Sequence, residues 1–508
     1  MSVACRARLD GNVYANKIKG VQKIMKPIRF IAFLLAVLTV FSIMTACATD
    51  PESTETQDPG QSGNETEEGT GIKDNLPADL RFEGEEVVFI SPEVLTYDEL
   101  TGVAVEDIIY ERNVAVEERL GVEINGIFDA NAIDKVVTAV SGGNTDYDVM
   151  VELCWRAAPK FTGNYFRNLR STAYLDFDKQ YWNQGFNEAV EYNGIQFGIT
   201  GAMLLSLYRS TYITIFNKDM FTDANQPFLY EHVENGTWTL DKQISLVPLF
   251  HRDNGNNAQD KSGDVYGFVS NDFISVDPYW SSCEVDIIKK NNDGDYEWVF
   301  DSAKLYDVAD KVLKLYYGTD GGSYIENDDV ASEGTVVSIY SAGNAAMATL
   351  RIAVLETDSI RGMPQEYGVV PIPKFSEDQK EYHSQMHDGF TIACLPNTVS
   401  EDRADMLSAV LESMGSVSYN VVRPTYYDTI LRTQIAKDPQ SAQMMDLIIN
   451  NINIDAGFVY SHSMGSFHQG FQQLVDSRNN DTISRYKRMT SSAKRSLEKL
   501  VTELDKLG

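Results

Sequence analysis

Histidine pairs and an acidic loop are the residues of this chain whose spacing could support metal chemistry. His383 and His387 are four residues apart, as two zinc ligands on a helix would be, but the intervening SQM lacks the glutamate of an HExxH motif. His462 and His468 straddle a glycine-containing loop, and chance proximity explains them. Residues 291–298, NNDGDYEW, match a calcium loop only as far as DGD, and a hairpin turn accounts for them. We therefore expect no metal site.

Motifs of nucleophilic catalysis and of nucleotide binding are also missing from the sequence. It contains no GxSxG, no P-loop and no GxGxxG at a strand–helix junction. Many pairs of carboxylates could be chosen for glycoside hydrolysis, but no local motif singles one out. We expect no catalytic residues and no cofactor, and so a protein that is not an enzyme.

Cys47 is the residue for which the sequence predicts covalent chemistry. The segment 25–47, MKPIRFIAFLLAVLTVFSIMTAC, has a basic start, fourteen uncharged and mostly apolar residues at 30–43, and small residues just before the cysteine. The apolar run is too short to span a bilayer comfortably. This pattern is typical of a lipobox, in which the thiol is acylated and the chain is cut just before it, although Met44 stands where leucine is usual.

Two alternatives to lipidation stay open, namely an ordinary secretory signal with an unrelated cysteine and an uncleaved anchor helix. We interpret residues 1–46 as a signal region, with Met25 as the true start because residues 1–24 have no apolar core. The following residues, 47–75, are acidic and almost free of apolar side chains, which predicts a flexible linker. A random coil of this length spans on the order of 30 Å. The expected location is the extracellular face of the cell membrane.

The composition limits the number of domains and the partners. Without signal and linker about 430 residues remain, which is more than one core usually holds, so we expect two or more lobes. Residues 1–46 hold seven of the 43 Lys and Arg and one of the 74 Asp and Glu, which leaves a net charge of −37 from Cys47 on. So acidic a chain repels nucleic acid. Cys154, Cys283 and Cys394 show no CxxC spacing, and buried apolar roles are expected.

The N-terminal part of the folded chain alternates between strands and helices. β-Branched runs predict strands at 86–91, 122–128 and 147–153. Spaced apolar residues predict helices at 105–120 and 133–140, each followed by glycine. Strand, helix, strand, helix, strand with short connections favours a largely parallel sheet covered by helices. Helices are also expected at 436–451 and 481–507 near the C-terminus.

These residues carry a resemblance to a family. The run ERNVAVEERLGVEI, followed by AIDKVVTAVSGGNTDYDVMV, resembles the N-terminal lobe of extracellular solute-binding proteins of ABC importers, which include maltose- and oligosaccharide-binding lipoproteins. Further strings similar to the family's landmarks follow in the same order: FNKDMF (216–221), GTWTLDKQISLV (236–247), DVYGFV (264–269), GNAAMATL (343–350), YGVVPIPK (367–374) and DGFTIACLPNT (388–398).

The resemblance implies a two-lobed, periplasmic-binding-protein-like α/β fold, each lobe a mainly parallel sheet flanked by helices, joined by crossing segments. It places lobe 1 at 83–210 and 370–430, and lobe 2 at 211–369 and 431–508. The first crossing is then expected near 207–214 and the return near 366–374.

The resemblance also implies a function. A monomer anchored through Cys47 would bind a small solute, which we expect to be a carbohydrate such as an oligosaccharide, and deliver it to ABC permease subunits. A surface-anchored glycoside hydrolase-like enzyme and a carbohydrate-binding or sensory module without transport remain alternatives.

Candidate ligand residues combine aromatic plates with polar groups, as sugar recognition requires. Trp155 and Arg156 follow the third expected strand at its carboxyl end, where open α/β sheets place ligands. The resemblance adds residues at the first crossing, at an aromatic position of lobe 2, after GNAAM and before the return strand: Tyr208, Arg209, Tyr279, Trp280, Arg351 and Asp388. Ordinary packing is the competing interpretation for each. Trp238, beside a helix cap, is expected in the core of lobe 2.

Overall fold

The computed structural model of the protein describes residues 71–256, 258–261, 263–327, 333–427, 429 and 439–507. The predicted signal region 1–46 with Met25, the predicted acylation site Cys47 and residues 48–70 of the predicted linker 47–75 lie outside the described residues. Everything below concerns the unit Thr70–Gly508. In this described part, no helix combines the length and apolar character needed to cross a membrane.

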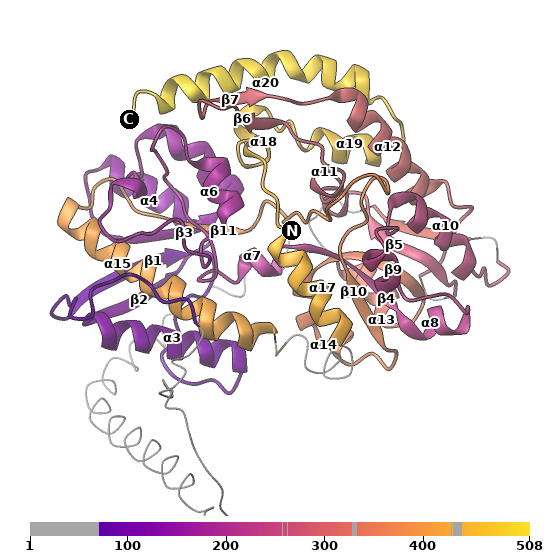
Figure 1. The fold of residues 1–508 in the computed structure, drawn as a ribbon, viewed down its shortest axis with the longest axis horizontal. Coiled ribbons are helices and arrows are strands. Elements are labelled where there is room, and N and C mark those ends of the chain that lie inside the picture. Colours follow the sequence, from indigo (N-terminus) through magenta and orange to yellow (C-terminus); the bar gives the residue numbers. More distant parts are fainter. Residues whose placement is uncertain are drawn as a thin grey trace, which may run out of the picture. The chain divides into compact units, whose positions relative to one another are not determined.

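The first sheet contains the three strands expected near the N-terminus and one strand from much later in the chain (Figure 1). Its members, in spatial order, are β11 (Thr391–Cys394), β3 (Val149–Leu153), β1 (Glu85–Ser91) and β2 (Val122–Phe128). β3, β1 and β2 are parallel, and β11 is antiparallel to β3. The carboxyl ends of the parallel strands therefore share one edge, where the first-lobe part of a site would lie.

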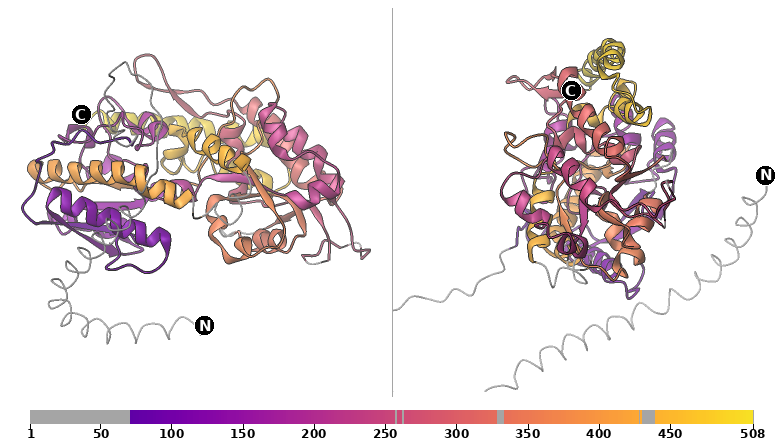
Figure 2. Two further views of the ribbon diagram at one scale, coloured as in Figure 1. Left: turned by 60° about the horizontal axis from the view of Figure 1, so that its bottom comes forward. Right: turned by 90° about the vertical axis from the view of Figure 1, so that its right-hand side faces the viewer.

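Helices cover both faces of this sheet because β1 and β3 bury apolar side chains on both sides. α3 (Ala104–Leu120) and α15 (Glu401–Val417) pack side by side over the face that holds Val87 and Phe89 (Figures 1 and 2). α4 (Ala132–Ser141) and α6 (Gln184–Val190) contribute to the core over the other face. Sheet and helices make up the first lobe.

α3 ends where the sequence predicts. Gly121 adopts the left-handed conformation with φ 66°, which glycine enters without a steric penalty, and its N–H bonds to the Glu117 carbonyl. The chain then enters β2 directly.

The second sheet holds the strands between residues 212 and 370. In spatial order they are β10 (Tyr367–Val370), β4 (Tyr212–Asn217), β9 (Ala345–Arg351), β5 (Tyr266–Asn271) and β8 (Ser323–Glu326). β10, β9, β5 and β8 run in the same direction, and β4, between β10 and β9, is antiparallel to both of its neighbours. α10 (Leu240–Phe250), α12 (Ser302–Tyr317), α13 (Gly334–Ser341) and α17 (Pro439–Asn450) pack on this sheet and complete the second lobe. The expected α/β fold of two helix-flanked sheets is confirmed.

The remaining elements connect the sheets or extend them. The shorter helices are α5 (Cys154–Ala157), η1 (Ala158–Gly163), η2 (Leu169–Ser171), α7 (Ser206–Arg209), α8 (Lys218–Asp223), α9 (Leu229–Glu234), η3 (Ile274–Val276), α11 (Tyr279–Ser282), η4 (Ile352–Glu356), α14 (Asp358–Arg361), η5 (Ser418–Val422), α18 (Ala456–Val459), η6 (His462–Met464) and α19 (Gly470–Asp476). β6 (Ile288–Lys290) and β7 (Tyr296–Trp298) form the hairpin expected around residues 291–295.

The chain crosses between the lobes at two adjacent segments. Residues 210–212 pair with 385–387: Tyr212 N–H bonds to the Gln385 carbonyl at 3.0 Å, and His387 N–H bonds to the Ser210 carbonyl at 2.9 Å. The first crossing thus lies within the expected 207–214. The return does not lie at 366–374, because β10 pairs with β4 as a strand of the second sheet and Lys374 stays bonded to Trp238. Residues 370–383 therefore belong with the second lobe.

The C-terminal segment contacts both lobes. α20 (Thr482–Leu504) is yellow in Figure 1 and packs on α12 of the second lobe and on η1 of the first. Its buried stripe, Ala493, Leu497, Leu500 and Leu504, faces this packing and confirms an intramolecular role. Cys154, Cys283 and Cys394 are buried free thiols, and Trp238 is fully buried, as expected.

Candidate functional site

Trp155 lies at the carboxyl end of β3, in the short helix α5. Its side chain is 38% exposed, which is unusual for a tryptophan beside a sheet edge. Two backbone bonds fix this turn on the returning chain: Cys154 N–H bonds to the Phe390 carbonyl at 2.8 Å, and Trp155 N–H bonds to the Asp388 carbonyl at 3.3 Å. The predicted residues Trp155 and Asp388 are therefore neighbours beside the crossing.

A polar and aromatic cluster surrounds this pair. The imidazole of His462 lies 5.5 Å from the Trp155 ring, centroid to centroid, with the planes at 45°. His462 Nε2 is 3.4 Å from Asp388 Oδ2. Gln469 Nε2 donates to the same oxygen at 3.3 Å, and His387 Nδ1 is 3.6 Å from Asp388 Oδ1. The cluster combines ring faces with hydrogen-bonding groups, which is the chemistry that a polar ring-shaped ligand requires.

The histidines set the charge of Asp388. Burial raises the pKa of its carboxyl, but the hydrogen bond with His462 and the charges of the neighbouring histidines outweigh burial and leave the pKa below its usual value. Burial lowers the pKa of His387. His468, fully buried behind the cluster, has its pKa lowered to about 3, chiefly by burial. Near neutral pH the cluster therefore presents a carboxylate beside uncharged His468.

Arg156 is held by the protein itself. Its Nη1 donates to the Ala130 carbonyl at 2.8 Å and lies 3.5 Å from Glu152, and its Nη2 lies 3.6 Å from Asp134. This places Arg156 at the shared edge of β2 and β3, next to Trp155, with its charge balanced by two carboxylates.

Arg209 forms a second cluster at the crossing. It makes a two-pronged ion pair with Glu356, and its guanidinium lies 5.6 Å from the Tyr426 ring. Burial lowers the pKa of Arg209, but Glu356 more than compensates and the pKa is raised. Tyr208 is buried against Tyr426 and Tyr427.

Arg351 ends β9 in the second lobe. Its Nε and Nη2 both lie 2.9 Å from Glu333 Oε2. Ile352 N–H, next along the chain, bonds to the Thr211 carbonyl at 2.9 Å, which ties this end of the sheet to the first crossing. Arg351 therefore borders the crossing with its charge balanced.

Tyr279 and Trp280 lie elsewhere, in the core of the second lobe. Trp280 is 2% exposed and stacks on His468 at 4.8 Å, and Tyr279 is fully buried. As ligand contacts they stay a prediction, which this conformation disfavours because both rings are covered.

The sequence interpretation missed two residues of the cluster, His462 and Gln469. It took the spacing of His462 and His468 as chance proximity, and no local pattern links His462 or Gln469 to Trp155. Phe128 ends the parallel strand β2 at the same carboxyl edge of the sheet and is 64% exposed. The rule that singled out Trp155 therefore applies to Phe128 as well.

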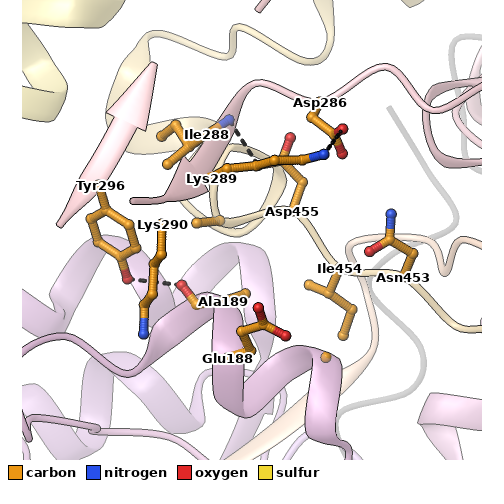
Figure 3. Close-up of a pocket in the computed structure, with 12 residues that line it drawn as sticks. Glu188, Ala189, Asp286, Ile288, Lys289, Lys290, Tyr296, Asn453, Ile454 and Asp455 are labelled. Carbon is orange, nitrogen blue, oxygen red and sulfur yellow. Dashed lines mark hydrogen bonds and ion pairs between the residues drawn. The ribbon is translucent and has the colours of Figure 1, made fainter. Parts of the chain in front are cut away.

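A separate cavity of 310 Å³ lies between α6 and the β6–β7 hairpin (Figure 3). Three of its charged groups are paired within the protein: Asp286 lies 2.6 Å from Lys289, and Asp455 accepts backbone N–H groups of Ile288 and Gly457. Among the described residues no group of three or more His, Cys, Asp or Glu could hold a metal ion.

Several solved structures are similar to this chain. The maltose/maltodextrin-binding domain MalE from Bdellovibrio bacteriovorus, solved with maltotriose, is 13% identical, with a TM-score of 0.52 over 82% of this chain and 100% of that one. UgpB from Mycobacterium tuberculosis, solved with glycerophosphocholine, is 14% identical, with a TM-score of 0.52 over 82% and 100%. The GacH receptor of Streptomyces glaucescens, solved unliganded and with acarbose, is 11% identical, with a TM-score of 0.50 over 83% and 99%.

No protein-family model matches the sequence, and no curated protein matches it. At these low identities the structural likeness establishes the fold. The expected resemblance to extracellular solute-binding proteins is confirmed at that level.

Proposed function

We propose that the protein is a lipid-anchored solute-binding protein that takes a carbohydrate, such as an oligosaccharide, between its two lobes and delivers it to an ABC permease. The observation that carries this proposal is the cluster at the crossing, where exposed Trp155 lies beside Asp388 and His462. The fold supports the proposal, since two similar proteins were solved with maltotriose and acarbose. UgpB, solved with glycerophosphocholine, shows that the fold also takes other solutes.

The electrostatics of the site favour a neutral ligand. Arg156, Arg209 and Arg351 are each paired with carboxylates. An anionic solute would have to compete with these pairs in a chain of strongly negative net charge. A sugar instead packs its C–H face on the Trp155 ring and bonds its hydroxyls to carboxylate and amide groups.

The proposed conformational change is a closure of the two lobes on the ligand. A ligand that contacts both lobes stabilises the conformation in which those contacts coexist. The paired segments 210–212 and 385–387 are the place where the backbone would bend. No bond of the solute is broken in this scheme, so it leaves unaltered.

A thermal-shift screen against mono- and oligosaccharides tests the proposal. A ligand present at one hundred times its dissociation constant should stabilise the protein by about 2.7 kcal/mol. Chromatography of the same mixtures separates binding from catalysis: intact sugar is expected after incubation, whereas shorter products would favour the glycoside hydrolase alternative. No stabilisation by any sugar of the screen would contradict the carbohydrate proposal.

Delivery and location belong to the same proposal. Acylation of Cys47 would hold the protein at the extracellular face of the cell membrane. The acidic linker would let the lobes reach a permease within roughly 30 Å. We propose that the protein acts as a monomer towards the permease subunits.

A further inference from the structure

His462 stands between two predicted ligand residues from different parts of the chain. Its ring is tilted against Trp155, and its Nε2 faces Asp388. All three side chains keep part of their surface exposed, His462 31% and Asp388 20%. The angled pair of rings is thus accessible from solvent and has a carboxylate at its side.

Asp388 fixes the relative positions of the Trp155 and His462 rings. Its backbone carbonyl accepts the Trp155 N–H, and its side-chain Oδ2 faces His462. One residue therefore positions both aromatic rings. Gln469 supports the arrangement, because its Nε2 donates to Asp388 Oδ2 at 3.3 Å.

The hydrogen bonds within the cluster determine which donors and acceptors remain for a ligand. With the proton on Nε2 facing the carboxylate, His462 Nδ1 is an acceptor, and Ser466 Oγ lies 3.5 Å from it. The Asp388 carboxylate has further acceptor capacity and Ser466 carries a hydroxyl. Hydroxyl groups on a ligand ring stacked on Trp155 and His462 could therefore bond to these groups.

We infer that His462 is a specificity-determining ligand contact: with Trp155 it forms an aromatic corner that receives a hydroxyl-bearing ring, and Asp388 is the residue that positions it. The inference rests on the proposed function. It adds a ligand contact from η6, which packs on η1 of the first lobe and on α20. It predicts that the protein prefers ring sugars over acyclic polyols.

The test is calorimetric titration of the full chain with maltotriose, cellotriose, xylotriose, mannotriose and acyclic sorbitol. For the trisaccharide that binds best, His462→Ala should lower affinity at least tenfold and reduce its preference over sorbitol. His462→Phe, which keeps a ring, should lower affinity only a few-fold. His383→Ala is the matched control, because His383 is similarly exposed and lies near Glu284, outside the cluster.

A double-variant cycle tests the positioning role of Asp388. Asp388→Asn should lower trisaccharide affinity, and it should cost less in the His462→Ala background than alone, because the part of the loss that comes from positioning His462 is already gone. Strictly additive losses would overturn the positioning role and leave Asp388 a ligand contact only. Unchanged affinity in His462→Ala, with loss in Trp155→Ala, would overturn the inference and leave the proposed function standing. If neither these trisaccharides nor any other sugar of the thermal-shift screen binds the unaltered protein, the carbohydrate proposal and this inference both fail.

Discussion

Arg209 and Glu356 join the two lobes beside the crossing through two hydrogen bonds, Nε to Oε1 at 2.8 Å and Nη2 to Oε2 at 2.9 Å. Arg209 ends α7, just before the chain enters the second lobe, and Glu356 ends η4 of that lobe. The Tyr426 hydroxyl donates a third bond to Glu356 at 2.7 Å. The segments that border the crossing are thereby held together.

Arg209→Met should lower the free energy of unfolding by about 1–3 kcal/mol, because it leaves a partly buried carboxylate without its cation. Urea denaturation measures this. Lys506→Met is the matched control, since the Lys506–Glu503 pair is exposed at the C-terminus and should be worth under about 0.5 kcal/mol. Equal effects of the two changes would show that the Arg209 pair adds no stability.

Trp155→Ala and Trp280→Ala should separate binding from folding. Trp155 is exposed, so its loss should weaken sugar binding and barely change the unfolding temperature. Trp280 is buried among aromatic rings, and its truncation should cost about 3–5 kcal/mol of stability. Calorimetry for binding and thermal unfolding for stability check both. A stable Trp280→Ala protein that loses only its ligand would restore Trp280 as a ligand contact.

Glu412 should make stability depend on pH. It is fully buried in the first lobe, where Trp182 Nε1 donates to it at 3.1 Å, and burial raises its pKa to about 7. The folded state therefore holds the proton more tightly than the unfolded chain does. The resulting stability is complete below the unfolded pKa and is lost as the pH rises through about 7.

Glu412→Gln removes this titration. Between about pH 4.5 and pH 8, the unfolding free energy of the unaltered protein should fall relative to the variant by on the order of 3 kcal/mol. Denaturant titrations of both proteins across this range give the difference. A constant difference would mean that the pKa of Glu412 is the same in the folded and the unfolded protein.

Cys47→Ser should abolish acylation and processing together. The sequence predicts that this thiol is acylated and that the chain is cut just before it, so the variant should incorporate no fatty acid and keep the apolar signal region. Labelling with a radioactive fatty acid and N-terminal sequencing of the mature protein check the two parts. An unaltered protein that takes up no label would favour the ordinary secretory signal or the uncleaved anchor helix.

Local patterns predicted much of the first lobe. β1, α3, β2, α4 and β3 lie within a few residues of their expected limits, because their apolar periodicity and the glycine at the end of α3 are properties of neighbouring residues. The two-lobed fold followed from the order of short strings along the chain.

Contacts between distant segments were beyond local patterns. The return crossing was placed too early because YGVVPIPK has an apolar run that fits either lobe, and only its pairing with β4 assigns it to the second. The contact between Trp155 and His462 depends on how the C-terminal segment folds back. Trp280 was chosen by position in the family, whereas its burial depends on Phe300, Phe471 and Tyr486.

The central claim is that a solute is gripped between the lobes and released intact. Small-angle X-ray scattering tests this claim most directly. It is measured on the unaltered protein and on Trp155→Ala, each with and without the best sugar of the screen, and the sugar is recovered and analysed afterwards. We predict a smaller radius of gyration on binding, no such change in Trp155→Ala, and intact sugar. An unchanged radius despite saturation, or a cleaved sugar, would contradict the account.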